Sequence, residues 1–133
     1  MTIACINNWA SIMDNIYKQI TASDLYKKID EIRCCIHSSD DKFRKHPFFG
    51  DSKVVVKKLY NKNIGNKFEK ATLDMLLDDS QKEEFYVLYL HSKGVSDRHQ
   101  NNLETESKIR AWTNYMLHYN IGQFKFILNK LEE

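Results

Sequence analysis

The order in which short apolar runs and helical patterns follow one another is the feature that most constrains this chain. Four runs are short, apolar and bounded by polar or turn-forming residues, as buried β-strands are: 2–6, 31–37, 53–59 and 85–90. From Trp9 to Ile20, apolar residues recur instead with the three-and-four spacing of an amphipathic helix. Strands that alternate with helices form parallel sheets through right-handed crossovers. The sequence therefore predicts a three-layer α/β fold, in which a mostly parallel sheet of about four strands, ordered 3-2-1-4, carries helices on both faces.

The run Phe85–Leu90 (Phe-Tyr-Val-Leu-Tyr-Leu) has the strongest strand pattern of the chain. Because every residue in it is apolar or aromatic, we expect both of its faces to be covered and the strand to be central. The segment Ser38–Ser52 contains the chain's proline, Pro47, together with Gly50, and this composition predicts an irregular loop.

Three further helical patterns follow the third predicted strand. The first covers about Lys67–Asp78, and the last begins after Asn120, which we expect to be its N-cap. The middle pattern carries an aromatic stripe that we expect to face the core: Trp112, Tyr115, Met116 and Tyr119.

The composition is that of one ordinary globular domain over residues 1–133, with 42% apolar and 29% charged residues. A formal net charge of +2 gives no electrostatic reason to expect nucleic acid as a partner. No stretch approaches the roughly 20 apolar residues that cross a bilayer, and the first residues do not have a signal-peptide pattern. We therefore expect no membrane span and a cytoplasmic location. Cys5, Cys34 and Cys35 are odd in number and lie in apolar runs, which predicts reduced, buried thiols.

Polar residues follow three of the predicted strands at the edge where open α/β sheets bind ligands. They are Asn7, Asn8 and Trp9 after the first strand, His37 and Ser38 after the second, and His91, Ser92, Lys93 and Gly94 after the fourth. A lysine beside a glycine suits phosphate, because the glycine lets backbone amides approach the ligand and the lysine supplies a point charge. The same tetrapeptide also fits an ordinary turn with a solvated lysine. We expect a cleft between the residues that follow the first strand and those that follow the fourth.

Acidic and basic residues elsewhere are weaker candidates. Asp40 and Asp41 follow the second strand and could hold a divalent cation that bridges phosphates, although loop acids are more often simply solvated. Arg110 has a functional role only if it points into the cleft. The chain has no glycine-rich dinucleotide fingerprint, no P-loop and no nucleophile elbow, so dehydrogenases, kinases and α/β-hydrolases lack their usual sequence support.

Four segments together resemble a family of GT-A-like glycosyltransferases of large DNA viruses and bacteria. The segments are Asn7–Trp9, Asp30–Cys34, Tyr89–Val95 and Arg110–Met116, and their order covers nearly the whole chain. The resemblance implies transfer of a sugar from a nucleotide-sugar donor to a glycan or protein acceptor, with Mn²⁺ or Mg²⁺ as a possible cofactor. It implies nucleotide binding by Asn7, Asn8, Trp9, His37 and Ser38, and diphosphate binding by His91, Ser92, Lys93, Gly94 and Arg110. A viral protein of this kind would be found in the host cytoplasm or the virion.

A second hypothesis belongs to another functional class. In the resembling enzymes an Asp-x-Asp metal motif usually stands where this chain has His91–Lys93, and those enzymes continue past the position of Glu133 into an acceptor-binding half. The chain would then correspond to the nucleotide-sugar-binding half, shortened at its C-terminus. A half-sheet with an open edge favours self-association. The alternative is therefore a non-catalytic interaction module that keeps the fold and forms a homo-oligomer.

Overall fold

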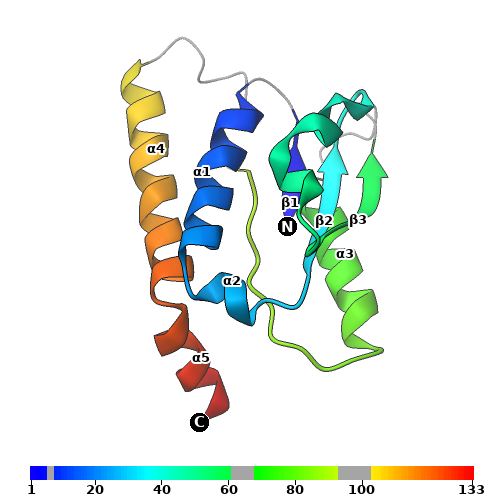
Figure 1. Cartoon of the computed structure of the whole chain (residues 1–133), viewed down its shortest axis with the longest axis vertical. Helices are drawn as coiled ribbons and strands as arrows, with labels where there is room; N and C mark the ends of the chain where they lie inside the picture. Colours follow the sequence, from blue (N-terminus) through cyan, green and yellow to red (C-terminus); the bar gives the residue numbers. More distant parts are fainter. Residues whose placement is uncertain (6–7, 61–67, 93–102) are drawn as a thin grey trace.

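The computed structural model describes residues 1–5, 8–60, 68–92 and 103–133, and it has an α/β fold (Figure 1). Its sheet contains β1 (Thr2–Ala4), β2 (Ile32–His37) and β3 (Val54–Tyr60) in the order β1-β2-β3. Both neighbouring pairs are parallel, so the predicted parallel α/β architecture is confirmed for these strands.

The strand register aligns the carboxyl ends of the three strands. Ala4 lies opposite His37, and His37 lies opposite Tyr60, so the last residues of all three strands share one edge of the sheet. The register of β2 against β3 shifts between Cys34 and Cys35. The sheet edge at which ligands are expected is therefore centred on His37.

The predicted fourth strand, Phe85–Leu90, does not form a strand in the structure. One isolated parallel bridge joins Thr2 to His91 instead, beside the free edge of β1. In this bridge Thr2 N–H donates to Leu90 O, and Ser92 N–H donates to Thr2 O, each at 3.0 Å. Because β1 has three residues, its ladder reaches only the end of the predicted strand.

The expectation that Phe85–Leu90 is central and covered is also wrong. Tyr86 is 61% exposed, and Phe85, Val87 and Leu88 are exposed as well. Residues 84–89 make no backbone hydrogen bond to any other residue that the structure describes. The apolar composition of this segment would allow it to be buried, but β1 is too short to pair with it.

The helix α1 (Trp9–Ala22) follows the predicted pattern, and its buried residues are Met13, Ile16 and Ile20. They belong to one hydrophobic cluster with alternate residues of β1 and β2, namely Ile3, Cys34 and Ile36. Side chains alternate along a strand, so these residues form one face of the sheet.

The helix α3 (Phe68–Ser80) contacts the intervening residues of the same strands. The hydroxyls of Thr2 and Thr72 are hydrogen-bonded at 2.5 Å, and Cys35 Sγ lies 3.7 Å from Met75 Sδ. Cys34 and Cys35 therefore point to opposite faces of β2, as the sequence predicts. All three cysteines are free, and Cys34 and Cys35 are buried whereas Cys5 is partly buried.

The segment between β2 and β3 is more regular than predicted. It contains two 3₁₀-helices, η1 (Asp41–Lys45) and η2 (Pro47–Gly50). Phe43 and Phe48 are fully buried in the main hydrophobic cluster, one from each short helix. Pro47 occupies the first turn of η2, where its missing N–H costs no hydrogen bond. Burial of the two phenylalanines explains why this turn-rich sequence is ordered into helical turns.

A polar cluster fixes the start of β3 against α1 and the short helix α2 (Leu25–Lys28). Asp51 Oδ2 accepts hydrogen bonds from the hydroxyls of Tyr17 and Tyr26, each at 2.7 Å. Lys53 Nζ donates to the carbonyl oxygens of Tyr26 and Ile29 at 2.8 Å and 2.6 Å. This cluster lies at the amino end of β3, far from the edge centred on His37.

The chain ends in α4 (Leu103–Leu117), a π-helical turn η4 (His118–Gly122) and α5 (Phe124–Glu132). Figure 1 shows α4 alongside α1, where Asn15 Nδ2 donates to Asn114 Oδ1 at 3.0 Å. The described helices include none that is both long and apolar enough to cross a bilayer.

Two predictions about these helices are wrong. Leu117 and Ile121 are the residues of α4 and η4 that join the main cluster. The aromatic stripe lies elsewhere on the helix surface and is exposed to a large extent, with Trp112 at 48%. Asn120 is inside η4 and does not cap α5, which is preceded by Gln123.

Candidate functional site

The candidate site is the carboxyl edge of the sheet, where three segments meet. The N–H of Cys5 donates to His37 O at 2.7 Å, and Ala4 N–H donates to Ser92 Oγ at 3.0 Å. The Thr2–His91 bridge lies next to the hydrogen bond between Ala4 and Ser92. The structure thus brings the end of β1 close to His37 and to the pair His91–Ser92.

His37 forms the centre of this edge. Its side chain is 6% exposed, and its ring is stacked on Tyr60 with a centroid distance of 5.1 Å and an angle of 15°. Beside it, Ser38 N–H donates to Tyr60 O at 3.0 Å, and the Ser38 hydroxyl donates to Asp40 O at 2.7 Å. Both residues are therefore held in place by the sheet and the turn that follows it.

The thiol of Cys5 lies at this edge but is not a nucleophile at neutral pH. Burial raises the pKa of Cys5 to about 12, and the negative charge of Asp40 adds to this effect, whereas a hydrogen bond with Ser38 opposes it. The thiolate is the reactive form of cysteine. The site therefore offers no activated sulfur for covalent chemistry among these residues.

His91 is more exposed to solvent than Ser92. The His91 side chain is partly exposed, and its Nδ1 lies 2.9 Å from Oε1 of Glu69 on α3. A carboxylate accepts hydrogen bonds, so the proton resides on Nδ1 and leaves Nε2 as an acceptor in the neutral ring. Ser92 is buried, and its Oγ already accepts from Ala4. Its hydroxyl proton can still be donated to a ligand.

The start of α1 contributes Asn8 and Trp9. Asn8 occupies the N-cap position, but its side chain makes no capping hydrogen bond. Trp9 packs against the segment between β2 and β3, with ring centroids 5.2 Å from His46 and 6.5 Å from Phe49. The indole therefore forms a wall between α1 and η2.

The acidic pair Asp40 and Asp41 lies after β2, where η1 begins. Asp40 accepts a hydrogen bond from Lys42 N–H at 2.9 Å and caps η1, and its Oδ2 lies 3.7 Å from Lys42 Nζ. Asp41 lies 3.5 Å from Arg44 Nε. No group of three or more potential ligands was found among the described histidines, cysteines and acids. A role for Asp40 and Asp41 in holding Mn²⁺ or Mg²⁺ stays a prediction.

The other predicted site residues are placed as follows. Arg110 is exposed on α4, and its Nη2 lies 3.7 Å from Glu106 Oε1 one turn away. Asn7, Lys93 and Gly94 lie outside the residues that the structure describes. They follow or precede the described members of the site directly in the chain.

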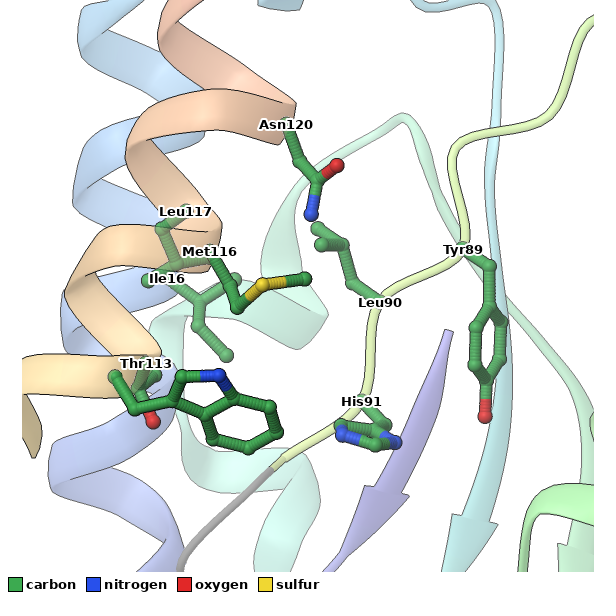
Figure 2. Close-up of a pocket in the computed structure, with 9 residues that line it drawn as sticks. Ile16, Tyr89, Leu90, His91, Thr113, Met116, Leu117 and Asn120 are labelled. Atoms are coloured by element: carbon green, nitrogen blue, oxygen red, sulfur yellow. The ribbon is translucent and has the colours of Figure 1, made fainter. Parts of the chain in front are cut away.

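A pocket of about 210 Å³ lies between the end of the 84–92 segment and the helices α1 and α4 (Figure 2). His91 is the predicted site residue that lines it. The other lining residues were not predicted as site residues, because a helical pattern does not reveal which element packs beside it. The i, i+4 pair Trp112 and Met116 is the sequence signal that could have indicated a wall.

Comparisons of the chain with protein-family models, with curated proteins and with solved structures found no match in any of the three. The resemblance of the four segments to GT-A-like glycosyltransferases therefore stays a prediction.

Proposed function

We propose that the chain binds a nucleotide-sugar donor along the carboxyl edge of its sheet, as the corresponding half of a GT-A-like glycosyltransferase does. The observation that supports this proposal is that the end of β1 lies beside both His37 and Ser92 at one edge of a parallel sheet. Asn8 and Trp9 follow β1 in the chain, where α1 begins. Ligands of open α/β folds bind at this edge.

The proposal assigns different parts of the donor to different segments. The nucleotide lies near Asn8 and His37, where α1 begins and its first backbone N–H groups lack intrahelical partners. The diphosphate lies near Ser92, where Lys93 supplies a positive charge and Gly94 lets the backbone approach. We assign no general base, and the acceptor, a glycan or a protein, binds beyond these residues.

The fold proposed for the bound state extends the described sheet. The Thr2–His91 bridge lies at the free edge of β1, which supports a fourth parallel strand in the order 3-2-1-4. With α1 and α3 against opposite faces, such a sheet would have three layers. Pairing of residues 85–89 requires a neighbour that the described chain does not provide.

The test is calorimetric titration of nucleotide sugars into the wild type and Lys93→Met. The substitution keeps most of the length and apolar packing of the side chain and removes its charge. We expect affinity to fall about tenfold to a hundredfold, since a charge-assisted hydrogen bond is worth about 1.5 to 3 kcal/mol. Titrations with and without Mn²⁺ examine the cation that the resemblance implies.

Lys28→Met is the matched control, because Lys28 is exposed at the end of α2, before β2 and thus at the opposite edge of the sheet. It should bind the donor as the wild type does. If wild type and Lys93→Met bind the donor with equal affinity, Lys93 does not contact the diphosphate. If none of the three proteins binds a nucleotide sugar, the donor-binding proposal itself is wrong.

A second candidate function is self-association as a non-catalytic module. It is supported by the extended segment 84–89, in which Phe85, Tyr86, Val87 and Leu88 are exposed and the backbone groups lack described partners. Such a segment is a template for a further strand, and two copies can pair antiparallel through the same residues on each.

Light scattering after size-exclusion chromatography tests this second candidate. The wild type should be a dimer at about 0.1 mM, and Tyr86→Lys should be a monomer because a charge opposes pairing at the edge. Phe126→Lys, an equally exposed position on α5, should leave the dimer intact. A monomeric wild type at that concentration would contradict this function.

A further inference from the structure

The pocket beside α4 has the size of a site for a single ring. Its volume of about 210 Å³ exceeds the roughly 150 Å³ of a cavity that holds benzene. It lies below the roughly 300 Å³ at which pockets for drug-sized ligands begin. A complete nucleotide sugar therefore does not fit in it, whereas one planar ring does.

The pocket walls are largely apolar and aromatic. Ile16 of α1 and Leu117 of α4 form its buried side, and Leu90 closes it from the extended segment. The ring of Trp112 also lines the pocket, and Figure 2 shows the ring of His91 at one end of it. Flat walls of this kind favour a planar ligand, because aromatic rings gain energy when they stack or meet edge to face.

Two polar side chains interrupt these walls. The side-chain amide of Asn120 lies at the end of the pocket away from His91 (Figure 2). His91 Nδ1 faces Glu69, and Nε2 is an acceptor when the ring is neutral. A ligand with matching polar atoms therefore gains hydrogen bonds that a purely apolar ring does not.

We propose that this pocket binds a planar six-membered ring with a lactam edge, that is, an N–H beside a C=O. The amide of Asn120 presents a donor and an acceptor, which match the C=O and N–H of a lactam. The site shares only His91 with the proposed donor site, so it does not depend on the nucleotide-sugar proposal.

Nuclear magnetic resonance can detect binding at the pocket itself. The probes are 2-pyridone, a lactam, and toluene, an apolar ring of similar size. The signals are the ε-methyl group of Met116 and the indole N–H of Trp112, both of which line the pocket. We expect 2-pyridone to shift both signals saturably with a dissociation constant of about 1 mM, and toluene to bind at least about fivefold more weakly.

One variant tests the polar group that the proposal uses. Asn120→Leu removes the amide while keeping a similar volume, and it should weaken 2-pyridone binding about fivefold to tenfold. It should not weaken toluene binding. Asn129→Leu is the matched control, because Asn129 is exposed on α5 and does not line the pocket. It should leave 2-pyridone binding unchanged.

The outcomes separate the ligand classes. If neither probe shifts the two signals up to about 20 mM, the pocket does not bind rings and the proposal is wrong. If toluene binds as tightly as 2-pyridone in the wild type, the site is merely apolar and the lactam assignment fails. Uracil and uridine distinguish the source of the ring: binding of both assigns the pocket to the base of a nucleoside, and binding of uracil alone assigns it to a free lactam.

Discussion

Lys53 Nζ lies 2.8 Å from the carbonyl oxygen of Tyr26 and 4.7 Å from the centre of its ring. The ammonium group therefore joins the residue before β3 to Tyr26 of α2 through two kinds of contact, a hydrogen bond and a cation–π interaction. A lysine in a run of basic residues is usually solvated, but this one is part of the protein's internal structure.

Lys53→Met should consequently lower the free energy of unfolding by about 2 to 4 kcal/mol, because it removes hydrogen bonds to two carbonyl oxygens that then lose their partner. Urea denaturation measures this loss. Lys28→Met, which removes an exposed lysine, should change stability by less than about 0.5 kcal/mol. Equal stability of the two variants would show that the Lys53 contacts contribute nothing.

The pair Tyr17–Asp51 predicts a loss of stability at high pH. The hydrogen bond to Asp51 raises the pKa of Tyr17 from 10.0 to about 12, with burial and the charge of Asp51 adding to the effect. The folded protein therefore holds this proton more tightly than the unfolded chain does. The contribution is fully present below pH 10 and is lost as the pH rises toward 12.

The free energy of unfolding, measured in urea across this pH range, should therefore fall more steeply for the wild type than for Tyr17→Phe. The variant cannot ionise at this position, and the slope that remains comes from other groups such as Tyr26, whose pKa Asp51 also raises. Identical slopes would rule out a tighter proton on Tyr17 in the folded state.

The cysteines should be unreactive until the protein unfolds. Burial raises the pKa of both Cys5 and Cys34 to about 12, so at pH 8 only about one in ten thousand of either is a thiolate. Labelling with a thiol reagent should be slow in the native state, and three groups should react after denaturation without reductant. Fewer than three would mean that a disulfide forms, contrary to the structure.

Phe48→Ala should destabilise the protein strongly, even though Phe48 lies between strands in a segment of turn-forming residues. The side chain is fully buried and meets Tyr17 edge to face at a centroid distance of 5.5 Å. We expect a loss of about 3 to 5 kcal/mol in urea denaturation. Phe126→Ala, at an exposed position, should cost less than about 0.5 kcal/mol. A small effect at both positions would mean that the segment is not part of the core.

Local patterns were sufficient to predict the parallel strands and the helices that pack on them. The helix α1 agrees with its pattern because the three-and-four spacing of Met13, Ile16 and Ile20 is itself the cause of its burial. The placement of His37 at the carboxyl edge of the sheet was also predictable, since the carboxyl ends of parallel strands necessarily align. These features depend on the spacing of neighbouring residues along the chain.

The features that were not predicted depend on distant residues. Phe85–Leu90 has the composition of a central strand, but pairing requires a neighbour of equal length, and β1 has three residues. The stripe with Trp112 indicates one face of a helix without indicating which face meets the core, and the structure buries Leu117 and Ile121 instead. The pocket was missed for the same reason, because its walls come from elements far apart in the sequence.

The position of β1 has a consequence for the order of folding. Thr2 bonds to Thr72, 70 positions away, and Ala4 bonds to Ser92, 88 positions away. Contacts over such separations close large loops and form slowly compared with helical turns. During synthesis, β1 leaves the ribosome before Thr72 and Ser92, the residues to which it bonds. Its contacts should therefore be complete only once Ser92 has emerged, and a nascent chain that ends before Ser92 would expose β1 to other proteins.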